Sequence, residues 1–254
     1  MIEEKVLISS TTGSDLHVIH YMESKEVKNP SILIMCHGFT GDKYEHGHFP
    51  ALAKACNREG IDGLIFDFTG SGENERVPVT LYKQIEDVES VYQWVQNQGY
   101  ENIAVLGLSF GGLTILGTNL PGIKTYIFWA PVLFLHTTED QTDWFRDLDK
   151  GPVEIPSSIE GKPIIIDMTY MIDFAKFRVK NHLKKFEYPV LIINGTSDEK
   201  TPCDLTKKAF NFLPNKDENK FIAIENAPHN FEGEHLEEFI KHTIDWLKFY
   251  LGGN

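Results

Sequence analysis

The sequence is poor in cysteine and in positive charge, and it has no long apolar run. Its three cysteines, Cys36, Cys56 and Cys203, lie far apart without a C-x-x-C pair, which argues against a disulfide framework or a cysteine-based zinc or redox site. We expect reduced, buried thiols. No window approaches the roughly 18 apolar residues of a membrane span, and the first residues lack the basic segment and apolar core of a signal peptide. We therefore expect a cytoplasmic protein.

Lysine and arginine number 24 against 37 aspartates and glutamates, which gives a formal net charge of −13. Such a surface repels phosphate backbones and anionic membranes, and no basic run stands out as an exception. We expect neither nucleic acid nor a membrane as a partner. The expected partner is a small-molecule substrate, and association into a homo-oligomer stays open.

Apolar runs alternate with helical patterns along the 254 residues, of which 41% are hydrophobic. Strands are predicted at 6–9, 16–21, 31–36, 63–66, 103–106, 125–129, 190–193 and 221–225. Helices are predicted at 81–95 and 236–251 from apolar residues at three- and four-residue steps. The alternation predicts one α/β domain over 1–254, with a doubly wound, mostly parallel sheet and an antiparallel N-terminal hairpin around Gly13. In such sheets ligands bind beyond the carboxyl ends of the strands.

The segment 131–187 breaks this rhythm with more charge and more aromatic residues. We expect an inserted lid or cap within the single domain; the alternative is a long connection with a short extra hairpin. Six of its aromatic residues could line a pocket for an apolar acyl group, or they could pack against one another in a separate core of this segment, its private core. The sequence does not decide between these two interpretations. They are Phe134, Trp144, Phe145, Tyr170, Phe174 and Phe177.

A serine stands between glycines directly after the apolar run 103–106, in "GLSFG". This G-x-S-x-G pattern, with a strand before it and a helix-like stretch after it, is typical of a nucleophile elbow. Glycine at 107 and 111 allows close backbone approach, while the tight turn projects the Ser109 hydroxyl from the sheet. The pattern predicts Ser109 as a nucleophile.

A serine hydroxyl needs a base, and that base needs an acceptor for its second nitrogen. His229, in "NAPHNFEG", is the expected base, because His235 and His242 fall on the predicted last helix. Asp198, in "NGTSDEKTP", follows an apolar strand and is the expected orienting acid; the adjacent Glu199 is the alternative. The chain order Ser109, Asp198, His229 is the order expected for such a site.

An acyl-transfer intermediate also needs two backbone donors for its oxyanion. The expected donors are Phe110 N–H, immediately after the serine, and Phe39 N–H, in the loop "CHGFTGD" after the predicted strand 31–36. His37 is expected to order this loop rather than to act as a second base.

A metal site or a cofactor site has weaker support in the sequence than the serine site has. His46 and His48 lie near Asp42 and Glu45 in "DKYEHGHFP", but no third ligand is identifiable, which favours a loop or helix start. The stretch 70–72 lacks the third glycine of a dinucleotide site, and no G-K-[ST] phosphate loop occurs. We expect no metal and no cofactor.

The motifs "HGFTG", "DFTGSGENE", "GLSFGG", "GTSDEKTP" and "APHNF" resemble, in this order, those of α/β-hydrolase-fold serine hydrolases. The chain is most similar to small carboxylesterases of the cinnamoyl (feruloyl) esterase type. Thr69 and Asn74 depart from the arginine and serine of many relatives. The resemblance implies hydrolysis of carboxylic esters. The acyl group of these esters would be a hydroxycinnamate or another small aromatic or short-chain acid. Peptidase, amidase or monoacylglycerol lipase activity would use the same residues, and a binding protein that has kept the fold without turnover is the alternative from another class.

Overall fold

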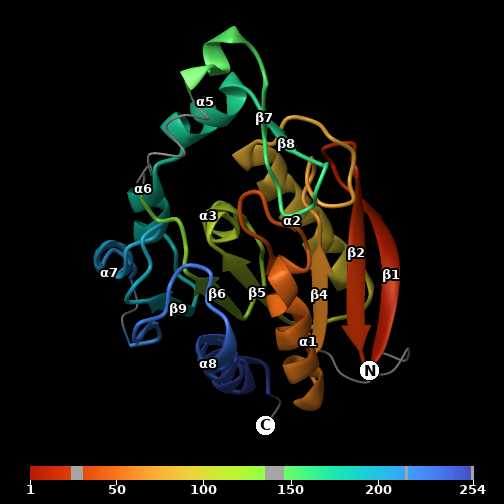
Figure 1. The fold of residues 1–254 in the computed structure, drawn as a ribbon. Helices are drawn as coiled ribbons and strands as arrows, with labels where there is room; N and C mark the ends of the chain where they lie inside the picture. The colour runs from red at the N-terminus through yellow and green to blue at the C-terminus, as the bar shows by residue number, and fades with distance from the viewer. Residues whose placement is uncertain (24–30, 135–145, 215–216, 253–254) are drawn as a thin grey trace.

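The computed structural model describes residues 1–23, 31–134, 146–214 and 217–252, and a β-sheet lies at its centre (Figure 1). Within these residues eight strands form the sheet, in the order β1-β2-β4-β3-β5-β6-β9-β10. Their bounds are β1 Ile2–Ser9, β2 Asp15–Met22, β3 Ser31–Cys36, β4 Asp62–Phe66, β5 Asn102–Leu108, β6 Thr125–Trp129, β9 Val190–Gly195 and β10 Lys220–Ile224. β2 is antiparallel to β1 and β4, and the other pairings are parallel. This confirms the predicted mostly parallel sheet with its N-terminal hairpin.

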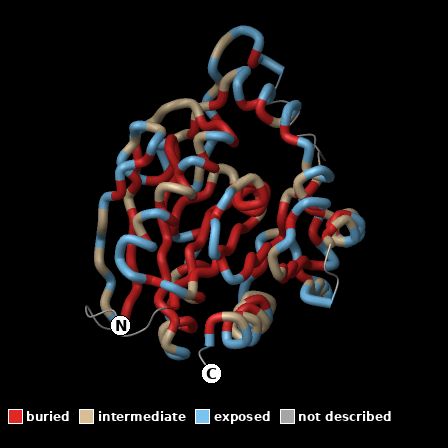
Figure 2. The backbone as a smooth tube through the Cα atoms, turned by 180° about the vertical axis from the view of Figure 1, so that it is seen from behind, coloured by how far each residue is buried: buried red, intermediate tan, exposed pale blue. Residues whose placement is uncertain are grey.

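Successive residues of the central strands face opposite layers of helices, because strand side chains alternate between the two faces of a sheet. On β3, Ile32 and Ile34 pack in the apolar cluster that includes α2 and α3, whereas Leu33 and Met35 pack in the cluster that includes α1 and α8. These helices span α1 His48–Arg58, α2 Leu81–Asn97, α3 Phe110–Leu116 and α8 Gly233–Leu251. Burying each such side chain stabilises the fold by about 1.5–3 kcal/mol. In Figure 2 the strands form a mostly buried layer between helices whose outer faces are exposed.

Local signals set the ends of the helices. Thr80 precedes α2 and its hydroxyl accepts the Lys83 N–H at 3.2 Å, which satisfies one of the unpaired donors of the first turn. Gly99, just after the helix, has φ +91°, a conformation that favours glycine. The helices predicted at 81–95 and 236–251 correspond to α2 and α8. A further helix, α7 Cys203–Phe210, follows β9.

The described part of the segment 131–187 contains a small hairpin, a short 3-10 helix and two α-helices; the hairpin and the first α-helix lie at the top of Figure 1, and the second α-helix lies lower, near α3 and α7. The elements are η2 Leu148–Lys150, β7 Val153–Ile155, β8 Ile164–Ile166, α5 Met168–Lys176 and α6 Val179–Lys184. The Val79 N–H donates to Ile165 O at 2.8 Å and so joins the hairpin to the chain before α2. The role of this segment as a lid stays a prediction.

The burial predicted for the three cysteines is found for two of them. Cys36 and Cys56 are buried and Cys203 is half-buried, and all three are unpaired. None of the helices in the described ranges combines the length and the apolar character needed to cross a membrane.

Candidate active site

Ser109 occupies a strained turn between β5 and α3. Its φ of +52° and ψ of −112° lie outside the regions that non-glycine residues favour. A β-carbon on Gly107 would collide with the backbone of Gly111, and one on Gly111 would collide with the backbone of Cys36. The turn is held on both sides, because Ser109 N–H donates to Trp129 O and Ser109 O accepts from Val132 N–H, each at 2.9 Å. Glycine at both positions therefore permits the turn, as the sequence predicts.

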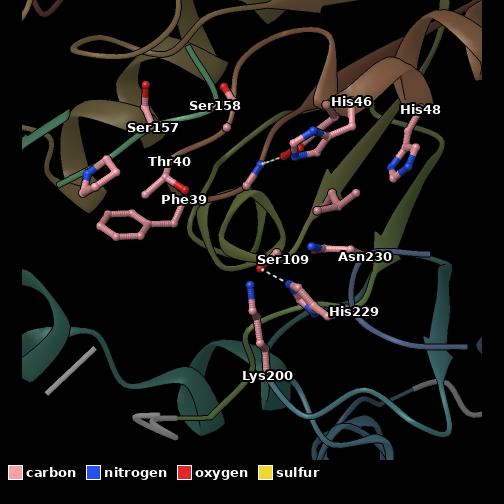
Figure 3. A pocket seen from close by; sticks show the side chains of 15 residues that line it. Phe39, Thr40, His46, His48, Ser109, Ser157, Ser158, Lys200, His229 and Asn230 are labelled. Atoms are coloured by element: carbon pink, nitrogen blue, oxygen red, sulfur yellow. Dashed lines mark hydrogen bonds between the residues drawn. The ribbon is translucent and has the colours of Figure 1, made fainter. Parts of the chain in front are cut away.

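His229 lies beside Ser109 (Figure 3), and its ring also contacts Asp198, so it meets both residues with which it was predicted to act. Its Nε2 lies 3.1 Å from Ser109 Oγ, and its Nδ1 lies 3.0 and 2.9 Å from the two Asp198 carboxylate oxygens. Since the carboxylate can only accept, this geometry assigns a proton to Nδ1, and in the neutral ring Nε2 then faces the serine as an acceptor. The structure thus brings together three side chains that lie 120 and 31 residues apart in the chain.

The Asp198 carboxylate is fixed by its own loop. It is 4% exposed and accepts hydrogen bonds from the Lys200 N–H at 2.9 Å, the Thr201 N–H at 2.7 Å and the Thr201 hydroxyl at 2.7 Å. Glu199, the alternative acid, is exposed, and both His235 and His242 lie on α8. The loops that carry Asp198 and His229 are joined where Ser197 N–H donates to Ala227 O at 3.1 Å.

The loop after β3 carries the predicted oxyanion donor Phe39 and packs directly against Ser109. A β-carbon on Gly38 would lie 3.4 Å from Ser109 Cβ. The His37 ring is buried, and its Nε2 accepts from Phe68 N–H at 3.1 Å while its Nδ1 donates to Gly38 O at 2.8 Å. Burial lowers the pKa of His37, which agrees with a neutral ring engaged at both nitrogens. His37 therefore orders the loop, as expected, and is not placed as a second base.

A buried ion pair anchors the same loop and was not foreseen from the sequence. Lys43 Nζ lies 2.6 Å from Asp67 Oδ2 and 2.7 Å from Glu73 Oε2. On the opposite side of the loop, the Ser158 hydroxyl donates to Asp42 at 2.5 Å and Ser158 N–H donates to Thr40 O at 2.9 Å. The loop is thus held by the chain after β4 and by the segment 131–187. The only local signal was the charged pair "DK" after "HGFTG".

Thr69 and Asn74, the departures from the family pattern, order the loop after β4 through partners of their own. Thr69 N–H and hydroxyl donate to the Asp87 carboxylate at 2.7 and 2.9 Å. The Asn74 side chain donates to Asp67 O at 2.7 Å and accepts from His17 N–H at 2.9 Å. This loop therefore has an ordered network without the arginine and serine of many relatives.

A cavity of about 290 Å³ opens beside Ser109 and His229 (Figure 3). Most of the side chains around it can form hydrogen bonds. They are Thr40, Glu45, His46, His48, Ser157, Ser158, Lys200 and Asn230. The cavity suits a compact ligand with polar groups better than a long apolar chain.

The aromatic residues of the segment 131–187 pack mainly against α3. Tyr170 and Phe174 form a cluster with Phe39 and Phe110, with ring centroids 5.0–5.8 Å apart. Of this cluster Phe39 lines the cavity beside Ser109. The described residues thus favour the private core, with Phe39 as its contact with the pocket. Trp144 and Phe145 lie outside the described residues.

His46 and His48 do not assemble a metal centre within the ranges that the structure describes, where no group of three or more His, Cys, Asp or Glu side chains converges. Their ring centroids are 6.4 Å apart, and the His48 ring stacks on Phe231 at 5.0 Å. Burial lowers the pKa of His48 to about 4, so this ring is neutral at neutral pH.

The strained strand–serine–helix turn on a mostly parallel sheet is typical of α/β hydrolases. The family model described as "alpha/beta hydrolase fold" matches residues 31–116, which include Ser109. The chain is 23% identical to "Putative esterase/lipase 2" of Mycoplasma genitalium, over 95% of this chain and 98% of that protein.

Solved structures are similar to this one over nearly the whole length of the chain. Est1E from Butyrivibrio proteoclasticus, with ferulic acid bound, is 20% identical with a TM-score of 0.79, covering 98% of this chain and 100% of its own. A thermophilic esterase from Thermogutta terrifontis, with malate bound, is 17% identical with a TM-score of 0.75, covering 98% and 99%. The chain therefore has the α/β-hydrolase fold.

Proposed function

We propose that this chain is a serine hydrolase that cleaves carboxylic esters through an acyl-enzyme intermediate. The observation that carries the proposal is the position of His229, whose ring reaches Ser109 Oγ at 3.1 Å on one side and Asp198 at 2.9 Å on the other. The names of similar proteins support ester hydrolysis, because a curated relative and several solved structures are described as esterases.

In the proposed mechanism Ser109 Oγ attacks the ester carbonyl carbon while His229 Nε2 takes the hydroxyl proton. The electron pair of the C=O bond moves to oxygen, and the N–H groups of Phe39 and Phe110 stabilise this oxyanion. When the pair returns, the C–O bond to the alcohol breaks and His229 gives its proton to the departing oxygen. Water then repeats these steps on the acyl-enzyme and releases the acid, while Asp198 orients the imidazole and stabilises its charged form.

The cavity supports a compact ester as the substrate. Its volume of about 290 Å³ lies just below the range of about 300–1,000 Å³ typical of small-molecule sites. We infer short-chain or small aromatic acyl groups, hydroxycinnamates among them; the ferulic acid bound to Est1E is consistent with this class.

The direct test measures p-nitrophenyl acetate hydrolysis and labelling by a fluorophosphonate probe, with wild type and Ser109→Ala side by side. We expect wild type to turn over and to be labelled, and Ser109→Ala to lose labelling and at least about 10³-fold in kcat. A wild type that neither turns over nor is labelled would favour the binding protein instead.

A substrate panel separates the remaining activities, which differ in the leaving group and in acyl length. The panel contains p-nitrophenyl acetate, butyrate and decanoate, methyl ferulate, a monoacylglycerol and an amino-acid anilide. We expect the highest kcat/KM for the short esters or methyl ferulate. A higher kcat/KM for the decanoate and the monoacylglycerol would indicate a lipase, and one for the anilide would indicate an amidase.

A further inference from the structure

A buried carboxyl group lies beneath the loop that follows β3. The Glu45 side chain is 6% exposed, and its Oε1 accepts a hydrogen bond from Gly38 N–H at 2.5 Å. Gly41 makes room for it, because a β-carbon there would lie 2.6 Å from the same oxygen. The loop is therefore shaped around this carboxyl group, which also lines the cavity beside Ser109.

The backbone at this point is strained. Glu45 has φ +42° and the next residue, His46, has φ +55°, in the left-handed region that non-glycine residues avoid. Such conformations cost about 1–3 kcal/mol each, and burial of a carboxyl group adds a desolvation cost. Strain of this kind persists where the surrounding structure over-determines it, and it gathers at functional sites. A role in the site explains why a glutamate is held here.

The hydrogen bonds of Gly38 connect Glu45 to the loop that carries Phe39. The Gly38 N–H is committed to Glu45, while the Gly38 carbonyl accepts from His37 Nδ1 at 2.8 Å and from Gly41 N–H at 3.1 Å. The Gly38 carbonyl and the Phe39 N–H belong to one planar peptide unit and point in opposite directions. Fixing Gly38 at both its N–H and its carbonyl therefore fixes the direction of Phe39 N–H.

We propose that Glu45 is a positioning residue for the oxyanion: its carboxyl oxygen holds Gly38 against Ser109 and so aims the Phe39 N–H at the reacting carbonyl. The inference rests on the proposed function, because it assigns a cause to the placement of one of the two proposed oxyanion donors. What the role requires of residue 45 is an acceptor oxygen at this point, with or without a negative charge.

Two substitutions of similar size distinguish the effect of the hydrogen-bond acceptor at residue 45 from the effect of its negative charge. Glu45→Gln keeps an oxygen that accepts from Gly38 N–H, whereas Glu45→Met fills a similar volume without a strong acceptor. Asp62→Ala is the matched control for the loss of a buried acceptor elsewhere. Asp62 is 7% exposed at the amino end of β4, whereas the site lies beyond the carboxyl ends of the strands, and it accepts from the Tyr100 hydroxyl at 2.6 Å.

The experiment measures kcat and KM for p-nitrophenyl acetate per fluorophosphonate-titrated site, together with the thermal midpoint of each variant. We expect Glu45→Met to lower kcat by about 10-fold or more with little change in KM, because loss of one oxyanion donor costs about 10²–10³ in kcat and a displaced donor forfeits part of that. Glu45→Gln should keep kcat close to wild type. Asp62→Ala should lower the thermal midpoint and leave kcat unchanged.

Three results would overturn the inference: an unchanged kcat in Glu45→Met, a Glu45→Gln variant as slow as Glu45→Met, or a raised KM at constant kcat, which would place Glu45 on the substrate. If Glu45→Met does not fold, the comparison of Glu45→Gln with wild type still decides, because a tenfold loss there contradicts the acceptor role. Failure of the proposed function is distinguished by the wild-type and Ser109→Ala arms, which do not involve Glu45.

Discussion

The ammonium group of Lys43 lies 2.6 Å from a carboxylate oxygen of Asp67, and the two side chains are 2% and 0% exposed. Asp67 also accepts the backbone N–H groups of Lys43 at 2.8 Å and Glu73 at 2.9 Å. The pair therefore joins the loop after β3, which carries Phe39, to the loop after β4.

Replacing Lys43 with methionine should destabilise the fold strongly, because it leaves the buried Asp67 carboxylate without its cation. We expect the free energy of unfolding to fall by about 3–5 kcal/mol, measured by urea denaturation. Lys208→Met is the control: its exposed partner Asp204 lies 3.1 Å away, and such pairs contribute about 1 kcal/mol or less. Equal losses in the two variants would contradict a structural role for the buried pair.

Asp198→Asn should lower kcat for p-nitrophenyl acetate by about 10³- to 10⁴-fold while residual activity stays measurable, because an amide no longer holds the imidazole in the productive tautomer. Glu199→Gln, one residue further on, should leave kcat unchanged, since Glu199 is exposed. The reverse pattern would assign the acid to Glu199.

Substitution of Gly111 should abolish the nucleophile turn, because a β-carbon there meets the backbone of Cys36. We expect Gly111→Ala to lose fluorophosphonate labelling. Gly161→Ala controls for backbone conformation: Gly161 has φ +72° but open space around it, so only a cost of about 1–2 kcal/mol in unfolding free energy is expected, with labelling retained. Full labelling of Gly111→Ala would mean that the turn can relax.

Deprotonation of the buried Glu45 should make the stability of wild type, relative to Glu45→Gln, fall as pH rises. Burial raises the pKa of Glu45 from 4.5 to about 7. Between these two values the unfolded chain has released a proton that the folded chain keeps, so the free energy of unfolding decreases as pH rises. Across that window we expect the stability of Glu45→Gln relative to wild type to increase by about 3 kcal/mol, and the difference to level off above pH 7.

The comparison between variants isolates Glu45 from the other buried groups that titrate in this pH range, some with the opposite effect on stability and one with the same effect. Burial lowers the pKa of His20 and of His48 to about 4, which makes stability rise with pH from about 4 to 6.5, and it raises the pKa of Asp87 to about 6. Urea denaturation of wild type and Glu45→Gln between pH 4.5 and 8 measures the difference. A difference that does not vary with pH would show that Glu45 titrates normally in the folded chain.

Local patterns were sufficient to predict the central strands and helices. The apolar runs at 31–36 and 125–129 are bounded by turn residues, and they match β3 and β6 at both ends. The first strand extends further than predicted: β1 begins at Ile2, because a half-exposed hairpin alternates polar and apolar residues instead of forming an apolar run.

Ser109, Asp198 and His229 could also be predicted from the sequence, since each stands in a loop directly after a predicted strand. Lys43 and Glu45 were not, because their roles depend on contacts made only once distant loops meet and, at Glu45, on a positive φ that no local propensity predicts. The sequence indicated Glu45 only as a neighbour of His46 in a rejected metal site.

The order in which the chain supplies these side chains has a consequence for its synthesis. Ser109 follows β5, but His229 comes after β10, at the far edge of the sheet. A nascent polypeptide still on the ribosome, with residue 229 not yet extruded, would hold the Ser109 hydroxyl without its proposed base. The proposed ester hydrolysis therefore requires that the last strand has already docked.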